Sequence, residues 1–212
     1  MNTEPQEPDA FLEKAGTTGQ WSDPNDAEAK EQIENLRQWA RATGREKNFE
    51  PPPEAELGRG NEQEVFHDPG SNRVYKRTYP PGTFGMIAFG NKLERIATPY
   101  FFLRRIALMN QVFGSDIRVE GITPGDKPSI VISQPYYKAA DPASPHPSPD
   151  EIARYMYSRG FEPLPDVPDA WSRESDGIFA YDTRPDNFIK TTKGVVPFDL
   201  VVQGGSSAFP GK

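Results

Sequence analysis

The chain of 212 residues, 35% of them hydrophobic, can form one domain or two small ones around a core of moderate size. Its 23 Pro and 18 Gly residues indicate that a good part of the length is loop or disordered segment. A net charge of -7 argues against broad electrostatic binding to nucleic acid, while the lack of Cys and the presence of only two His exclude disulfides, thiolate catalysis and His-rich metal sites.

The first part of the chain, residues 1–25, is polar and punctuated by Pro, which predicts a disordered arm. It lacks the basic start and apolar run of a signal peptide, and no stretch approaches the roughly 20 apolar residues of a membrane span. We therefore expect a soluble, cytoplasmic protein without membrane contact. Residues 26–53 predict an amphipathic helix, with Leu36 and Trp39 at helical spacing, and then a linker whose three consecutive prolines permit neither helix nor central strand.

The main domain is expected at residues 54–212 and begins with short strands separated by turn residues. Thr98 followed by Pro99 is typical of a helix start, and here it leads into a dense apolar run that predicts a mostly buried helix. A Pro-rich loop at 139–149 precedes a second helix with its own cap, Pro and closing Gly. The expected strands are 54–60, 62–68, 73–79, 116–122, 129–137, 177–181, 187–191 and 194–200, and the expected helices are 97–114 and 148–160.

Three polar residues stand in an apolar setting near the end of the sequence: Asp182, Asn187 and Asp199. Burying a charge is costly unless something pairs it. Two carboxylates and an amide brought together form an oxygen-rich site for a hard cation such as Mg²⁺. The alternative is an ordinary surface turn, in which Asp, Pro and Asn are common, and for Asp182 or Asn187 alone that interpretation is favoured.

A glycine-containing turn lies in the first strands. Gly58 and Gly60 permit a tight turn whose backbone N–H groups can face a phosphate, and Val65 can pack on a flat apolar ligand. Lys76 on a following strand points inward if Val74 does. Taken alone, the two glycines favour an ordinary hairpin, and neither a dinucleotide fingerprint nor a Walker-type phosphate loop is present.

In combination, these motifs resemble the protein-kinase-like fold over residues 55–200. The resemblance is nearest to the small serine/threonine/tyrosine kinase-like domains of bacterial and phage polyvalent proteins. The matches are Gly58, Gly60 and Val65 with G-x-G-x-x-G-x-V, Lys76 with the strand Lys of V-A-I-K, Asp182 and Asn187 with D-x-x-x-x-N, and Asp199 with the Asp of D-F-G.

The resemblance implies an α+β, protein-kinase-like fold. Its N-lobe, 54–134, would be an antiparallel five-stranded sheet with one buried helix, and its C-lobe, 135–212, would be reduced and truncated. It also implies ATP and Mg²⁺ as cofactors. The glycine turn would then cover the ATP phosphates, and Lys76 would contact the α and β phosphates.

The remaining roles implied by the resemblance concern the transferred group and the base. Asn187 and Asp199 would hold Mg²⁺, and Asp182 would orient or deprotonate the attacking hydroxyl. Arg184 could neutralise charge near the γ-phosphate. Backbone groups from Gln134 to Tyr136 would meet the adenine.

The function expected on this basis is phosphate transfer from ATP to a hydroxyl of an unidentified small molecule or protein. A nucleotide-binding pseudokinase or a protein-interaction module is the alternative, and nucleotidyl transfer is a third, weaker one. Thirteen residues follow Asp199, fewer than follow the corresponding Asp in a conventional kinase. The chain could therefore be a fragment of a longer protein, a minimal kinase or a non-catalytic nucleotide binder.

The sequence departs from the kinase pattern at several positions. Gln63 replaces the third glycine, Ala180 stands where H-R-D has His, and Leu200-Val201 replace Phe-Gly. The predicted buried helix contains no acidic residue. Two kinds of partner therefore remain for Lys76: Glu94 before the helix, or an amide such as Gln111 within it.

Overall fold

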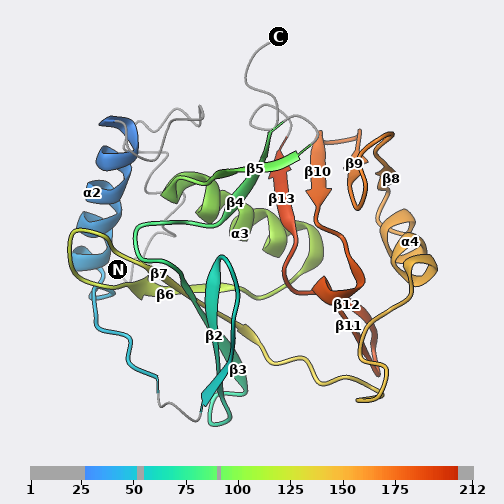
Figure 1. The fold of residues 1–212 in the computed structure, drawn as a ribbon, viewed down its shortest axis with the longest axis horizontal. Coiled ribbons are helices and arrows are strands. Elements are labelled where there is room, and N and C mark those ends of the chain that lie inside the picture. Colours follow the sequence, from blue (N-terminus) through green and yellow to red (C-terminus); the bar gives the residue numbers. More distant parts are fainter. Residues whose placement is uncertain (1–26, 52–54, 90–91, 205–212) are drawn as a thin grey trace, which may run out of the picture. The chain divides into compact units, whose positions relative to one another are not determined.

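The computed structural model describes residues 27–51, 55–89 and 92–204, and the side chains of residues 89 and 92–96 lie outside this description (Figure 1). The predicted arm, residues 1–25, also lies outside it. The described chain is a mixed α+β structure with antiparallel sheets, so the α+β class is confirmed. Its α-helices are α2 (Ala27–Ala42), α3 (Pro99–Phe113) and α4 (Pro149–Tyr157). In this part of the chain, no helix is long and apolar enough to cross a membrane.

The chain divides into two compact units. Among the described residues, the first unit contains those up to Ile87, Arg95–Ala107 and Asp116–Tyr136. The second unit contains Ala88–Glu94, Leu108–Ser115 and the described residues from Tyr137 on.

The first unit is built on a five-stranded antiparallel sheet with the strand order β1-β2-β3-β7-β6. The predicted antiparallel five-stranded sheet is therefore present. The carboxylate of Asp68 accepts hydrogen bonds from the Gly70 N–H at 2.9 Å and the Ser71 hydroxyl at 2.6 Å, which stabilise the predicted turn between β2 and β3. The strands are β1 (Glu56–Arg59), β2 (Gln63–Asp68), β3 (Arg73–Thr78), β6 (Arg118–Ile122) and β7 (Ile130–Pro135).

Helix α2 belongs to the same unit as this sheet, although the sequence analysis places it outside the main domain. Its apolar face is largely buried, with Leu36 0% and Trp39 1% exposed. The chain after α2 then bonds to β6: the Ile122 N–H donates to the Arg45 carbonyl at 3.0 Å, and the Lys47 N–H donates to the Ile122 carbonyl at 3.1 Å. The apolar pattern of α2 is thus explained by packing onto its own unit.

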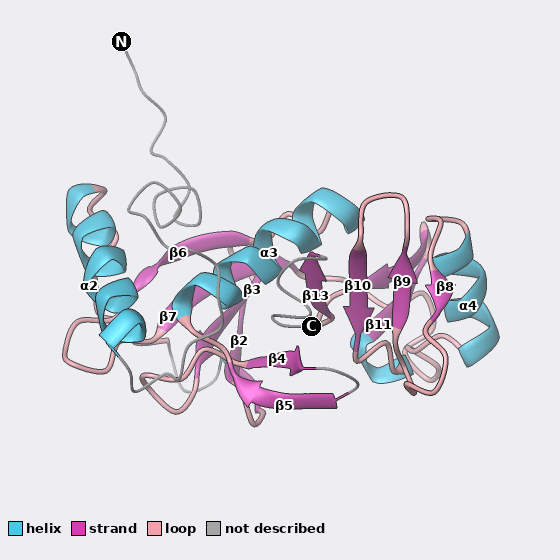
Figure 2. Ribbon diagram, turned by 90° about the horizontal axis from the view of Figure 1, so that it is seen from above, coloured by secondary structure: helices cyan, strands magenta, loops and turns pink. Residues whose placement is uncertain are grey.

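The second unit contains a four-stranded sheet with the order β13-β10-β9-β8, a separate hairpin and α4 (Figure 2). Three of its strands, β8, β9 and β13, were not predicted. The strands are β8 (Glu162–Pro163), β9 (Trp171–Arg173), β10 (Ile178–Tyr181) and β13 (Val201–Gly204), with the hairpin formed by β11 (Phe188–Thr191) and β12 (Gly194–Pro197). The pair β4 (Met86–Phe89) and β5 (Lys92–Ile96) was not predicted either.

Candidate functional site

The turn after β10 holds Asp182 and Asn187 together. Asn187 closes the short 3-10 helix η2 (Pro185–Asn187) and is 8% exposed. Its side-chain Nδ2 donates to the Asp182 carbonyl at 2.7 Å and to Asp182 Oδ2 at 2.8 Å. Two of the three residues singled out near the end of the sequence are therefore in direct contact, and the spacing of five residues is the span of this turn.

Arg184 binds the other oxygen of the same carboxylate. Its Nε donates to Asp182 Oδ1 at 2.7 Å, and its Nη2 lies 3.6 Å from Asp186 Oδ2. The hydrogen bond to Asp182, followed by the charge of that carboxylate, raises the pKa of Arg184. Each Asp182 oxygen thus has one donor, and since an ionised carboxylate has about four lone-pair sites, it can still accept a further proton or hydrogen bond.

The hairpin β11–β12 leads the chain back to this turn. Phe188 and Pro197 are Cα partners at its open end, and the Phe198 N–H donates to the Asn187 carbonyl at 3.0 Å. Phe188 is fully buried and anchors the hairpin. Asp199 therefore follows directly on a residue that is hydrogen-bonded to Asn187. It lies beyond the end of β12, which corrects the expectation of a strand through residue 200.

The donor set of this turn fits a hard cation. Because Nδ2 of Asn187 is turned to Asp182, the carbonyl oxygen of the same amide is the atom left to act as a ligand. Carboxylate and amide oxygens are the groups that Mg²⁺ prefers. Among the described residues there is no group of three or more His, Cys, Asp or Glu side chains placed to hold a metal ion, so a metal here would need this amide and ligands from a nucleotide in addition to any single carboxylate.

The sequence did not indicate the residues whose hydrogen bonds hold the turn of Asp182 and Asn187 in place. The Thr183 N–H donates to the Asp169 carbonyl at 3.0 Å, and the Trp171 indole N–H donates to the Thr183 hydroxyl at 3.1 Å. Thr183 is 3% exposed, so both bonds are shielded from water. No spacing in the sequence signals these partners, because they come from a loop and a strand more than ten residues upstream.

In the first unit, the glycine turn differs from the expectation. The Gly60 N–H donates to the Gln63 carbonyl at 2.8 Å, so this amide is used within the hairpin and does not face outward toward a phosphate. Gly58 is the Cα partner of Val65, and a Cβ on Gly58 would meet no atom within 4 Å. The backbone therefore shows no need for glycine at position 58.

Lys76 lies where the sequence predicts it, on the buried face of β3. It is 4% exposed, shares this face with Val74, and is the Cα partner of Val65 on β2 and Ile132 on β7. Lys is almost never fully buried unless it is paired. The side chain of Glu94 lies outside the description and Gln111 is exposed, so the partner proposed for Lys76 stays a prediction.

The segment expected to meet adenine, Gln134 to Tyr136, uses some of its groups in packing and hydrogen bonds within the protein. Gln134 is buried and pairs with Val74 across β3 and β7. The Tyr136 N–H donates to the Asn72 carbonyl at 3.0 Å, so this amide is used within the fold. The ring of Tyr136, 40% exposed, lies 4.2 Å from the ring of His67.

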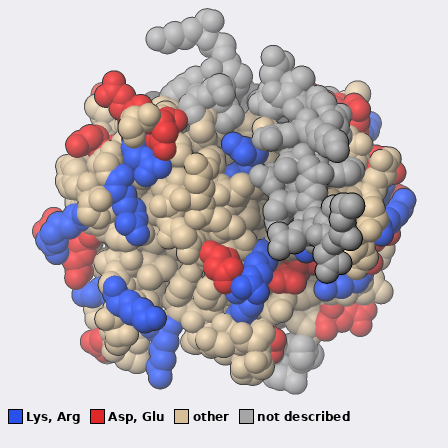
Figure 3. Space-filling view, turned by 180° about the vertical axis from the view of Figure 1, so that it is seen from behind, with Lys and Arg blue, Asp and Glu red and all other residues tan. Residues whose placement is uncertain are grey.

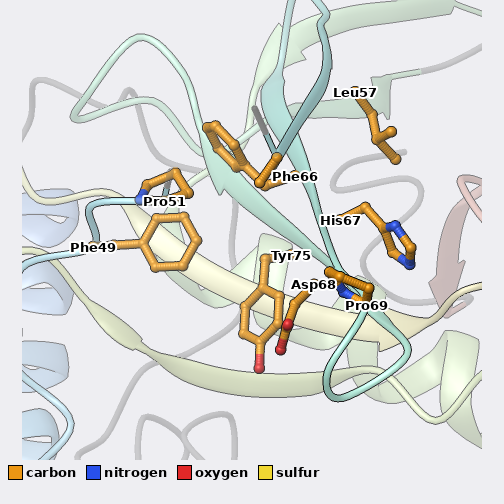
Figure 4. Close-up of a pocket in the computed structure, with 9 residues that line it drawn as sticks. Phe49, Pro51, Leu57, Phe66, His67, Asp68, Pro69 and Tyr75 are labelled. Carbon is orange, nitrogen blue, oxygen red and sulfur yellow. The ribbon is translucent and has the colours of Figure 1, made fainter. Parts of the chain in front are cut away.

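A cavity of about 510 Å³ lies in the first unit, beside strands β1, β2 and β3 (Figure 4). Phe66 and Tyr75 line it, whereas Lys76 alternates to the opposite face of the sheet. None of the residues that the sequence indicates as functional is part of its lining.

On the face shown in Figure 3, Lys and Arg side chains lie next to Asp and Glu side chains rather than in an area of their own.

Comparison of the sequence with models of known protein families finds no match, and a search of curated proteins finds no similar sequence.

Proposed function

We propose that the protein is an ATP- and Mg²⁺-dependent phosphotransferase that acts on a hydroxyl group. One observation supports this most: the side chain of Asn187 is bonded to Asp182 while its backbone carbonyl receives the N–H of Phe198, the residue before Asp199. The turn of the second unit thus holds the base candidate Asp182 and the metal-ligand candidate Asn187, and the backbone hydrogen bond of Phe198 supports Asp199 as a second ligand.

The proposed roles follow from the chemistry of each side chain. Asp182 orients the acceptor hydroxyl and takes its proton, because its carboxylate keeps acceptor capacity beside Arg184 and Asn187. Asn187 and Asp199 hold Mg²⁺, which neutralises charge on the nucleotide phosphates. Arg184, whose side chain is 51% exposed, supplies a cation within reach of the same carboxylate. Phosphoryl transfer needs mainly positioning and electrostatic stabilisation, which these residues can provide.

The role of Lys76 in nucleotide binding is a separate part of the proposal. Its burial on a sheet face and the resemblance to the strand Lys of kinases support it. Nucleotide affinity should fall in Lys76→Met, measured by isothermal titration with the non-hydrolysable analogue of ATP and Mg²⁺.

The alternative is a nucleotide-binding or interaction module without catalysis. It is favoured by the amides of Gly60 and Tyr136, which are used within the fold and not open to a nucleotide.

Phosphate transfer is tested with ATP labelled at either the γ or the α position. The protein is incubated with Mg²⁺ and cell extract, and acceptors are followed by gel and thin-layer chromatography. We expect γ-label transfer that EDTA abolishes and that falls at least about a hundredfold in Asp199→Asn. The matched control is Asp186→Asn, because Asp186 lies in the same turn and is 60% exposed, and it should retain activity.

Three other outcomes contradict the proposal. Transfer of the α-label indicates nucleotidyl transfer, binding without transfer indicates a pseudokinase, and equal losses in Asp199→Asn and Asp186→Asn indicate that the turn is not the catalytic centre.

A further inference from the structure

A small cavity of about 180 Å³ lies within the second unit, beside the turn of Asp182 and Asn187. Thr183 and Pro185, which belong to that turn, form part of its wall. The first turns of α4 contribute Ile152, and Trp171 at the start of β9 contributes as well. The loop that joins β8 to β9 contributes Leu164, Val167 and Asp169.

The walls of this cavity are tied to one another by hydrogen bonds. Within the loop, the Leu164 N–H donates to the Ala170 carbonyl at 2.8 Å, which closes it into a compact ring. The Thr183 N–H bonds to the Asp169 carbonyl and the Trp171 indole bonds to the Thr183 hydroxyl, as described above. The cavity is therefore attached to the same turn that holds the proposed base.

The volume limits what the cavity can bind. The cavity has about 180 Å³ of space. Sites for drug-sized ligands and cofactors usually have about 300–1,000 Å³. The cavity is too small for a nucleotide and fits a single long side chain.

The lining selects the chemistry of that side chain. Leu164, Val167 and Trp171 supply apolar walls, and Asp169 is the charged residue among those that line the cavity. Residues 162–170 contain Glu162, Asp166 and Asp169 but no Lys or Arg. Within the described part of the chain, neither Asp166 nor Asp169 forms an ion pair, so this loop presents negative charge beside apolar surface.

The charge of Asp169 has only a weak effect on the nearby cation Arg184. The pKa of Arg184 is raised first by its hydrogen bond to Asp182 and only last by the charge of Asp169. Asp169 itself is exposed, so a cation from outside can reach its carboxylate. Lys and Arg match such a site, because each has an aliphatic stem for apolar walls and a charged end for a carboxylate.

We propose that this cavity binds a Lys or Arg side chain of a polypeptide acceptor, with the stem against Leu164, Val167 and Trp171 and the charged end at Asp169. This inference rests on the proposed function, because it names the acceptor class: a protein segment in which a basic residue lies close to the hydroxyl that receives phosphate.

The test measures binding and transfer separately. The probes are fluorescein-labelled peptides of Gly and Ala with one Ser and one Lys, the Lys being moved to each position around the Ser in turn. In the matched peptides, norleucine replaces Lys and keeps the stem without the charge. Binding is measured by fluorescence anisotropy without nucleotide, and γ-label transfer is measured with ATP and Mg²⁺.

Two protein variants separate the cavity from general charge effects. Asp169→Asn removes the charge but keeps the carbonyl that accepts the Thr183 N–H, and its φ of 53° is one that Asn tolerates. Asp166→Asn is the control, because Asp166 has a similar φ of 62° in the same loop but does not line the cavity. Thermal unfolding checks that both variants fold.

We expect one or two Lys positions to bind best, Asp169→Asn to weaken that binding about tenfold, and Asp166→Asn to leave it nearly unchanged. Norleucine peptides should bind weakly to all three proteins. Equal binding of Lys and norleucine peptides, or equal losses in the two variants, would overturn the inference.

The two proposals fail in different ways. If Lys peptides bind through Asp169 but no γ-label is transferred in any assay, the proposed function is wrong and the basic-side-chain site is supported. If label is transferred without preference for a basic residue, the function is supported and this inference is overturned.

Discussion

At the scale of single residues, Asp182 adopts an uncommon backbone conformation. Its φ is 57°, in the left-handed region that few residues other than Gly adopt, although Asp and Asn are enriched there. Such a conformation persists where surrounding contacts determine it. Here the side chain of Asn187 bonds to both the carbonyl and the carboxylate of Asp182. These two hydrogen bonds therefore fix the direction of the Asp182 carboxylate.

Tyr181, the residue before this turn, provides a prediction about stability. It is 2% exposed, burial raises the pKa of its phenol, and its hydroxyl has no hydrogen-bond partner among the described residues. Because an unpaired buried hydroxyl is costly, Tyr181→Phe should raise the free energy of unfolding by about 1 kcal/mol in urea denaturation.

The matched control is Tyr137→Phe. The Tyr137 hydroxyl donates to the Ser115 carbonyl at 3.1 Å, so its removal should lower the free energy of unfolding by about 1 kcal/mol. If Tyr181→Phe destabilises the protein as much as Tyr137→Phe, the hydroxyl of Tyr181 has a partner after all.

At the scale of elements, the two helices that begin with Pro are capped in different ways. Helix α4 has a capping box, in which the Glu151 N–H donates to the Ser148 hydroxyl at 3.3 Å and the Ser148 N–H donates to Glu151 Oε2 at 2.8 Å. Helix α3 does not use the predicted cap, because the Thr98 hydroxyl has no hydrogen-bond partner in the described structure. Instead, the Tyr100 N–H donates to the side-chain oxygen of Gln32, on α2, at 3.2 Å.

The capping box of α4 predicts a pH dependence of stability. Its hydrogen bond to the Ser148 N–H, followed by the contact with Lys190, lowers the pKa of Glu151 from 4.5 to about 2. A carboxyl whose pKa is lower in the folded state stabilises the protein fully above its unfolded pKa and loses this contribution as the pH falls through the folded value. The stability difference between the wild type and Glu151→Gln should therefore be constant above about pH 5 and shrink between about pH 4.5 and pH 2.

Thermal unfolding at a series of pH values measures this difference. Lys190→Met removes only the ion pair to Glu151, 2.9 Å in length, and should give a smaller change in the same direction. A difference that stays constant down to pH 2 would contradict the lowered pKa.

At the scale of the whole molecule, each compact unit has buried residues of its own. In the first unit, α2 and the chain that follows it are joined to the sheet at β6, where Gly121 lies at a register shift. Gly121 has a φ of 152°, and a Cβ there would overlap the carbonyl oxygen of Arg45. Only glycine allows the two backbones to approach so closely.

Gly121→Ala should therefore separate the chain after α2 from the sheet. We expect the free energy of unfolding to fall by about 3 kcal/mol, because backbone strain and a backbone overlap add together. Gly125→Ala is the control: its φ of 105° is also unfavourable for Ala, but no atom lies within 4 Å of the added Cβ, so a loss of about 1 kcal/mol is expected. Equal losses in chemical denaturation would show that the contact with Arg45 is unimportant.

The candidate site was predictable in part. Residue type and spacing indicate Asp182 and Asn187, and the structure brings them into contact because the turn is local. The alternation with Val74 places Lys76 on the inner face of its strand. Nothing in the sequence indicates Thr183, because its hydrogen bonds to Trp171 and Asp169 depend on the β8–β9 loop and the strand that follows it.

The sequence by itself determined what depends on neighbours along the chain: the cap of α4, the turn at Asp68 and the five-residue span from Asp182 to Asn187. Alternation and capping patterns act over a few residues, so they are visible without a fold. Only the tertiary structure decided the order of the strands in each sheet, that Gln32 caps α3, and that the amides of Gly60 and Tyr136 are occupied. The physical reason is that a strand pattern specifies which face is buried but not which partner satisfies each backbone group.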